Sequence, residues 1–304
     1  MKIVHFSDVH IGVENFSRTD PETGLPSRLL DFLSTLDEVV DYCIDNEADL
    51  ALFCGDAYKS RNPSQTHQRE FAKRIARLSG AGVPAFLVEG NHDIPAVAGR
   101  ATALDIFQTL DVPGVTVGNR LETYLVEIRS WSVQIIALPW IRRSGFLTRD
   151  ETRGLAPEQV NELIQTRLTD IVADRVASLD PTLPALLAGH LTVSEAKLSS
   201  EQSMMLGRDY VLLKSSLAVP QLDYVALGHI HRQQVLAERP HMAYSGALQR
   251  VDFGEEGDEK GFCVVDLDTV APQGRRMTGF EFAGVNARRL LTISVDVKDG
   301  DPDP

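Results

Sequence analysis

Five short apolar runs in this chain of 304 residues are each followed at once by residue types that bind metals. The runs IVHF, LALFC, VPAFLVE, ALLA and DYVAL lead into Asp8-Val9-His10, Gly55-Asp56, Gly90-Asn91-His92-Asp93, Gly189-His190 and Gly228-His229-Ile230-His231. Short apolar runs bounded by turn residues predict buried strands. Ligands of open α/β sheets bind beyond the carboxyl ends of the strands. We therefore expect the five clusters to converge on one site.

Helical and strand patterns alternate through the first half of the chain. Helices are expected at 28–46, at 63–79 with Pro63 at the start and Gly80 just beyond the end, at 102–110 and at 157–178. Further strands are expected at 115–117, 124–128, 133–138 and 262–267, and residues 191–221 are expected to form a loop with short helical pieces. This alternation predicts a mainly parallel sheet flanked by helices.

The net charge of −13 argues against a protein that coats nucleic acid by bulk electrostatics. The charge does not exclude a nuclease, because metal ions and a local basic patch can supply the positive field that binds phosphate. The sequence shows no apolar stretch of membrane-spanning length and no signal-peptide pattern. Cys43, Cys54 and Cys263 form no CxxC pair and fit buried thiols in a reducing compartment. We expect a cytoplasmic protein with no membrane partner.

Each cluster alone is a weak signal, since a lone Asp after a strand is commonly a helix cap and GNHD is commonly a turn. All five in order argue against chance. The order DxH, GD, GNHD, GH, GHxH resembles the calcineurin-like metallophosphoesterases over residues 1–231. This resemblance implies an α/β fold in four layers, with a two-sheet β-sandwich flanked by helices.

The resemblance also implies the metal ligands. One metal would be held by Asp8, His10, Asp56 and His231, and the second by Asp56, Asn91, His190 and His229. Asp56 would bridge the two ions. Such a mixture of oxygen and imidazole donors suits Mn²⁺, Fe or Zn²⁺. It differs from the all-oxygen sites that Mg²⁺ and Ca²⁺ usually occupy. We expect two Mn²⁺ ions, with Mg²⁺, Fe and Zn²⁺ as alternatives.

His92 and Asp93 are the expected catalytic residues. His92 follows a ligand and has no metal assigned to it, so it is a candidate general acid or a group that stabilises transition-state charge. Asp93 is the natural partner to orient His92, although an aspartate at this position could equally form a turn.

The segment GDAYKSR distinguishes between phosphoester substrates. Phosphoprotein phosphatases of this superfamily carry GDxxDRG, whereas this chain has Lys59 and Ser60 in place of Asp and Arg. The segments SDVHIG, GRATAL (99–104), GHIH and YSGALQRVDFGEEGDEKGF (244–262) instead resemble the bacterial SbcD nucleases. That resemblance implies exonuclease action on DNA ends and single-strand endonuclease action in double-strand break repair. It also implies an SbcC-like ATPase partner, a homodimer and a nucleoid-associated location.

The resemblance divides the chain into a nuclease domain, 1–285, and the start of a truncated capping domain, 286–304. The segment 287–297 would be the first strand of that cap, and a C-terminal segment that docks on the ATPase would be missing.

The densest basic stretch of the chain contains Lys59, Arg61, Arg69, Lys73, Arg74 and Arg77. It is either a solvated helix face or, at Lys59 and Arg61 beside the metal site, a contact to DNA phosphates. We expect Lys59 and Arg61 to bind DNA. Related nucleases carry Asp or His where this chain has Lys59, which leaves the balance of exonuclease and endonuclease action open.

Two other functions compete with a nuclease. A metallophosphoesterase could act on a small phosphoester or cyclic nucleotide, but the GRATAL and YSGALQR segments argue against it. A non-catalytic scaffold could use the same fold, but it would be free to lose ligands that are all present here.

Overall fold

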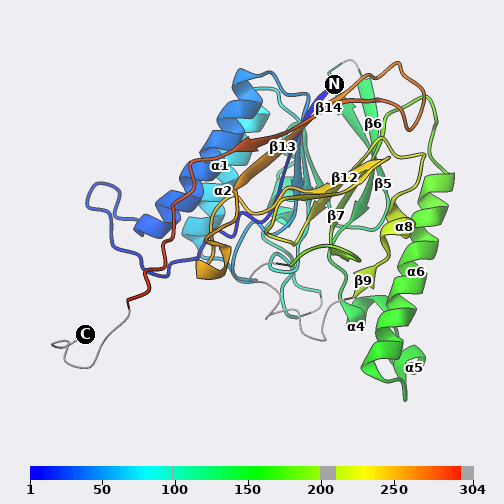
Figure 1. Ribbon diagram of the computed structural model, residues 1–304, viewed down its shortest axis with the longest axis horizontal. Coiled ribbons are helices and arrows are strands. Elements are labelled where there is room, and N and C mark those ends of the chain that lie inside the picture. The colour runs from blue at the N-terminus through cyan, green and yellow to red at the C-terminus, as the bar shows by residue number, and fades with distance from the viewer. Residues whose placement is uncertain (98, 130, 199–209, 296–304) are drawn as a thin grey trace.

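The computed structural model describes residues 1–97, 99–129, 131–198 and 210–295. In this part of the chain, two six-stranded sheets pack against each other and helices cover their outer faces (Figure 1). This is the four-layer α/β sandwich that the resemblance implied. The single mainly parallel sheet expected from strand–helix alternation is therefore two mixed sheets.

The first sheet has the order β14-β13-β1-β2-β3-β4. Its strands are β1 (Lys2–Phe6), β2 (Leu50–Cys54), β3 (Ala85–Val88), β4 (Val115–Gly118), β13 (Gly261–Leu267) and β14 (Met277–Gly284). Strands β1 to β4 are parallel, whereas β13 pairs antiparallel with both β1 and β14. Every side chain of β2 is buried because the strand lies in the middle of the sheet, with a layer on each face.

The second sheet has the order β11-β12-β10-β7-β6-β5. Its strands are β5 (Thr123–Ile128), β6 (Trp131–Leu138), β7 (Ala185–His190), β10 (Tyr224–Gly228), β11 (Gln234–Glu238) and β12 (His241–Tyr244). The four central strands are parallel, and β5 and β11 are antiparallel edges. A separate parallel pair joins β8 (Thr192–Val193) to β9 (Val211–Leu212).

Three apolar layers hold the sandwich together. Because strand side chains alternate between faces, Leu50 and Leu52 of β2 enter the core between the sheets, while Ala51 and Phe53 face the helices. The first sheet packs on α1 (Ser27–Asp45), α2 (Gln65–Gly80) and α3 (Asp105–Thr109), and the second on α6 (Pro157–Ala177) and α8 (Lys214–Leu217). The short elements α4 (Arg143–Phe146), α5 (Arg149–Thr152) and the 3₁₀ turn η1 (Phe253–Glu255) lie in the connections.

Both ends of the helix expected at 63–79 differ from the structure. Helix α2 begins at Gln65 rather than Pro63, because the Ser64 side chain accepts a hydrogen bond from the His67 backbone N–H and caps the helix. Gly80 is its last residue, not the one beyond it. In the stretch expected as loop, β8, β9 and α8 form, and residues 199–209 lie outside the described part.

The prediction of a strand at 287–297 is wrong over its described part, 287–295. The backbone N–H of Thr292 donates to the Glu256 carboxylate instead of a neighbouring strand, and Arg288 forms an ion pair with Asp31. Residues 296 and 297 lie outside the described part. The expected domain boundary at 285/286 stays a prediction.

The described residues contain no helix that is both long and apolar enough to cross a membrane. All three cysteines are buried free thiols, as expected from their spacing.

Candidate metal centre

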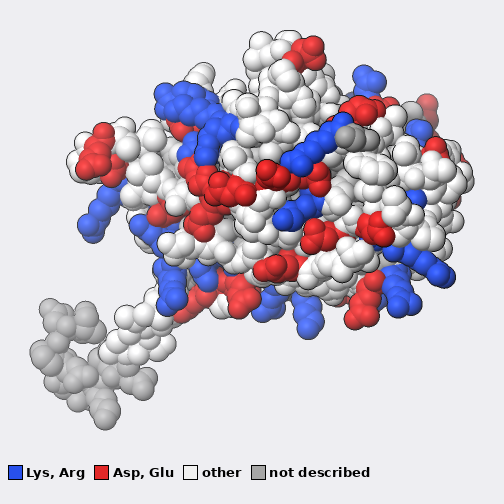
Figure 2. Space-filling view, turned by 90° about the horizontal axis from the view of Figure 1, so that it is seen from above, with Lys and Arg blue, Asp and Glu red and all other residues white. Residues whose placement is uncertain are grey.

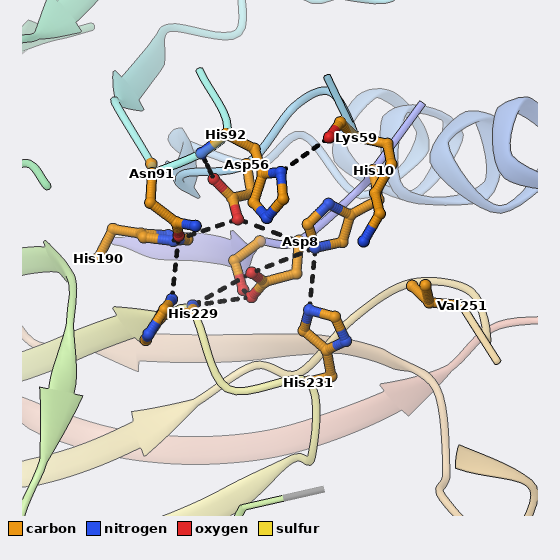
Figure 3. A network of polar contacts seen from close by, with 12 residues as sticks. Asp8, His10, Asp56, Lys59, Asn91, His92, His190, His229, His231 and Val251 are labelled. Atoms are coloured by element: carbon orange, nitrogen blue, oxygen red, sulfur yellow. Dashed lines mark hydrogen bonds and ion pairs between the residues drawn. The ribbon is translucent and has the colours of Figure 1, made fainter. Parts of the chain in front are cut away.

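The five predicted clusters meet at one edge of the sandwich, where strands of both sheets end (Figure 3). Asp8, Asp56 and Asn91 follow β1, β2 and β3 of the first sheet. His190 ends β7 of the second sheet, and His229 follows β10. The site therefore draws its donors from both halves of the fold.

His10 and His231 point their Nε2 atoms at each other across 2.9 Å. The His10 Nε2 also lies 3.9 Å from Asp8 Oδ1 and 3.8 Å from Asp56 Oδ2. Donor atoms of Asp8, His10 and His231 fall within 4.8 Å of one another, and all three residues are buried. Such a buried cluster of imidazole and carboxylate donors can hold a metal ion.

A second group surrounds Asn91. Its Oδ1 lies 2.9 Å from His190 Nε2 and 3.1 Å from His229 Nδ1, and His190 Nε2 lies 3.4 Å from Asp56 Oδ2. The same Asp56 oxygen thus lies within 4 Å of a histidine from each group. This position suits a carboxylate that bridges two metal ions.

Two histidines are held by partners on the far side of their rings. The His190 Nδ1–H donates to the Cys54 carbonyl across 2.7 Å, and the His231 Nδ1–H donates to Glu255 Oε1 across 2.6 Å. Both bonds leave Nε2 available to a metal and fix the ring orientation. These buried donors therefore fit a two-metal site.

Glu255 contacts a proposed ligand, His231, and was not predicted from the sequence. It is fully buried, and its other oxygen lies 2.8 Å from Nζ of Lys260, which is also buried. Burial alone would raise the pKa of Glu255, but His231 and Lys260 hold it well below its ordinary range. The residue lies in the acidic run FGEEGDEK, where no local signal separates one carboxylate from the others.

The electrostatics of the centre favour a cation. Burial alone would raise the pKa of Asp56, but the imidazoles of His190 and His92 hold it well below its ordinary range. Burial alone would lower the pKa of His190, yet Asp56 raises it to about 9. Asp56 is thus a buried ionised carboxylate, which positive charge stabilises.

The backbone at the ligands is strained. Asp8, His10, Asp56 and His229 have φ angles of 52°, 51°, 62° and 97°, in the left-handed region that side chains with a Cβ rarely adopt. Strain of this kind gathers at functional sites, where the surrounding structure enforces it. A Cβ on Gly90 would lie 2.2 Å from Asp56 Oδ1, so only glycine fits there.

His92 lies between Asp56 and His10 (Figure 3). Its backbone N–H donates to Asp56 Oδ1 across 2.8 Å, and its Nδ1–H donates to the Lys59 carbonyl across 2.7 Å. The Lys59 backbone therefore sets the ring orientation and leaves Nε2 as the nitrogen that can serve the site.

Asp93 does not orient His92 as expected. Its carboxylate is buried and accepts hydrogen bonds from the backbone N–H groups of Asp56, Ala57 and Gly90, at 2.8, 2.9 and 2.9 Å. Asp93 thereby ties the loop after β2 to the loop after β3. The adjacent sequence positions of His92 and Asp93 suggested a contact between their side chains. The carboxylate instead binds the three backbone N–H groups.

The basic stretch divides into two parts. Arg69, Lys73, Arg74 and Arg77 form ion pairs with Glu70, Asp37 and Asp41 on α1 and α2, as expected of a solvated helix face. Lys59 and Arg61 form no ion pair with any described carboxylate. Arg61 Nε donates to the Asn91 carbonyl across 3.0 Å, so Arg61 lies beside the centre.

A two-sheet sandwich with clustered metal donors at its strand ends defines the metallophosphoesterase class. This chain belongs to the calcineurin-like phosphoesterase family, whose profile matches residues 1–233. That family binds a dinuclear metal site.

The chain is 29% identical over 289 residues to the SbcD component of the nuclease SbcCD from Rhodobacter capsulatus, covering 88% of this chain and 66% of that protein. It is 24% identical over 267 residues to the protein of that name in Escherichia coli K12, covering 86% and 63%. It is 24% identical over 322 residues to the DNA double-strand break repair protein Mre11 of Archaeoglobus fulgidus, covering 97% and 62%. The chain thus spans slightly less than two thirds of the length of these relatives.

Among solved structures, a dimetal phosphatase from Danio rerio aligns with a TM-score of 0.45 and 12% identity, covering 87% of this chain and 92% of that one.

Proposed function

We propose that this chain hydrolyses phosphodiester bonds of DNA at a two-metal site. The observation that carries the proposal is the convergence of seven buried or half-buried donor residues at one edge of the sandwich. The relatives that bear the name of a nuclease or a DNA break-repair protein support DNA as the substrate.

Two groups of residues would hold the metals. Asp8, His10, Asp56 and His231 form one set, and Asp56, Asn91, His190 and His229 form the other. When bound, two Mn²⁺ ions supply Lewis-acid chemistry to phosphoester hydrolysis. Asp56 offsets charge in both sets, and Glu255 and the Cys54 carbonyl keep His231 and His190 turned toward them.

His92 supplies the proton in this proposal. Its Nδ1–H is occupied by the Lys59 carbonyl, so Nε2 gives a proton to the leaving oxygen or donates a hydrogen bond to developing charge. Asp93 contributes through position alone, by holding the loops that carry Asp56 and Asn91. Lys59 and Arg61 contact DNA phosphates beside the centre.

The proposal extends to assembly. We propose that the chain works as a homodimer with an SbcC-like ATPase in double-strand break repair, with exonuclease action on DNA ends and endonuclease action on single strands. Its place would be the cytoplasm, at the nucleoid. The naming of the relatives as one component of SbcCD supports the partner. Lys59 stands where related nucleases carry Asp or His, so the ratio of the two activities has to be measured.

A substrate panel tests the function. Purified protein with Mn²⁺ is incubated with end-labelled duplex, hairpin and single-stranded circular DNA, bis-p-nitrophenyl phosphate, p-nitrophenyl phosphate and a cyclic nucleotide. We expect cleavage of DNA and of the bis-ester. Hydrolysis of the monoester or cyclic nucleotide without DNA cleavage would support the small-substrate alternative. Inactivity toward every phosphoester would support the scaffold.

A further inference from the structure

A hollow of about 260 Å³ lies beside the metal centre. Its lining comes from residues 61–63, Gln68, Pro95 and residues 100–103. Arg61 joins this wall to the centre, because its Nε donates to the carbonyl of Asn91, a proposed ligand. Arg142 reaches the wall at Pro95, where it donates to the Pro95 carbonyl.

Three arginines give the hollow its charge, and we call it the arginine hollow. Arg61, Arg100 and Arg142 form no ion pair with any carboxylate in the described part of the chain, and no acidic residue is among the lining residues. Arg61 lies close enough to Arg142 to help lower its pKa, after burial as the larger cause. Glu89, the acid that opposes this shift, is buried and accepts a hydrogen bond from Thr102 across 2.6 Å.

This arrangement differs from the other arginine-rich parts of the molecule. On α2, Arg74 and Arg77 are neutralised by carboxylates of α1. On the face that Figure 2 shows, basic and acidic side chains lie interspersed. Unpaired guanidinium groups repel one another unless an anion lies between them, and a guanidinium fork matches the oxygens of phosphate.

We propose that the arginine hollow binds a backbone phosphate of the DNA strand, next to the phosphate that is hydrolysed. The inference rests on the proposed nuclease function, since that function places the scissile phosphate at the metal centre. Arg61 then links the two places: its Nε holds the Asn91 backbone while the rest of its guanidinium faces the second phosphate. The hollow would favour substrates with at least two consecutive phosphates over small phosphoesters.

A pair of short substrates isolates this contact. A thymidine dinucleotide carries one phosphodiester, whereas a trinucleotide carries two. Arg100→Ala and Arg142→Ala are compared with wild type on both, with kcat/KM and the salt dependence of binding to a longer oligonucleotide. The matched control is Arg175→Ala, an exposed arginine at the end of α6, outside the hollow. Thermal unfolding checks that each variant folds.

The expected result is a loss of kcat/KM that is roughly tenfold larger on the trinucleotide than on the dinucleotide, as for one lost charge-assisted phosphate contact. The slope of log K against log salt should fall by about one for each variant and stay unchanged for the control. Equal losses of kcat/KM on both substrates, or no loss, would overturn phosphate binding by the arginine hollow. Cleavage of DNA by the wild type would still support the nuclease function. A wild type that cleaves no DNA would overturn both.

Discussion

At the residue scale, the Asp56 carboxylate and the His92 ring lie side by side, but we propose a metal-binding role for Asp56 and a proton-transfer role for His92. Asp56 Oδ2 lies within 4 Å of ring nitrogens in both ligand groups, while its Oδ1 accepts the backbone N–H of His92. The His92 ring forms no ion pair with a carboxylate in the described part of the chain, and the Lys59 carbonyl fixes its orientation. Removing His92 should therefore affect proton transfer and spare the metals.

His92→Ala should keep both metals and lose roughly 100- to 10,000-fold in kcat, the range for a removed general acid. Metal content by elemental analysis and turnover on bis-p-nitrophenyl phosphate measure the two effects separately. His67→Ala is the control, because His67 on α2 pairs with the exposed Glu14 and with no ligand residue. Loss of metal from His92→Ala would make the residue structural rather than catalytic.

Glu255→Gln should weaken metal binding roughly 10- to 100-fold, as expected when the carboxylate behind a ligating histidine is lost. It also removes the nearer carboxylate of the buried Lys260, whose remaining partner Asp258 lies 3.9 Å away, which costs up to about 3–5 kcal/mol in the free energy of unfolding. The double variant Glu255→Gln with Lys260→Met removes that charge and should recover stability without recovering metal affinity.

Metal titration and denaturant unfolding measure the two quantities. Glu259→Gln, an exposed neighbour, is the control. If the double variant regained wild-type metal affinity, Glu255 would act on the fold and not on His231.

Glu255 was not predicted, and Asp93 was predicted with a contact that it does not make, for different physical reasons. Glu255 is one of several acids in a short run, and only the packed turn η1 selects it for His231. Asp93 follows His92 directly, but its carboxylate turns to three backbone N–H groups that no sequence pattern reports. The seven proposed ligands lie in clusters at or just after the ends of buried strands, and their assignment as ligands came from the family resemblance.

At the element scale, the loops at the strand ends carry the proposed ligands. The loops after β1 and β2 cross at close range, with the Asp8 N–H donating to the Gly55 carbonyl and the His10 N–H to the Asp56 carbonyl. The loop after β3 approaches so closely that Gly90 touches Asp56. A side chain at Gly90 would push the Asp56 carboxylate out of its position.

Gly90→Ala should therefore lower metal occupancy and cost about 1–3 kcal/mol of stability, as other overpacking substitutions do. The built Cβ would lie 2.2 Å from Asp56 Oδ1 and 2.4 Å from the Asp56 backbone nitrogen. Gly80→Ala is the matched control, since a Cβ there meets nothing within 4 Å and alanine favours the helix. Elemental analysis and thermal unfolding compare the two variants. Full metal content in Gly90→Ala would show that metal binding does not depend on the close approach of Gly90 to Asp56.

The elements that could be predicted are those with a continuous apolar run. Strands β2 and β10 are buried along their whole length, and their predicted positions are confirmed. Strands β11 and β14 were missed because their residues are mostly half-buried or exposed, so polar and apolar positions mix. The segment 287–295 is apolar enough to suggest a strand, but its Thr292 N–H donates to the Glu256 carboxylate and its Arg288 carbonyl accepts from the Arg250 side chain.

At the scale of the whole molecule, the metal centre joins the two sheets. Asp8, Asp56 and Asn91 come from the first sheet, and His190, His229 and His231 come from the second. The number of sheets could not be read from strand–helix alternation, which is compatible with one sheet or two. The resemblance to a known family supplied that information, and the packing of the core between the sheets confirms it.

We propose that Asp56 bridges two metals that this chain needs for hydrolysis. Its direct test is the metal content of wild type and Asp56→Asn after equilibration with Mn²⁺, measured together with hydrolysis of bis-p-nitrophenyl phosphate. We expect about two Mn²⁺ per wild-type chain. For Asp56→Asn we expect reduced metal content and no measurable hydrolysis, because the bridging charge is lost. Two bound metals and near-normal hydrolysis in Asp56→Asn would contradict it.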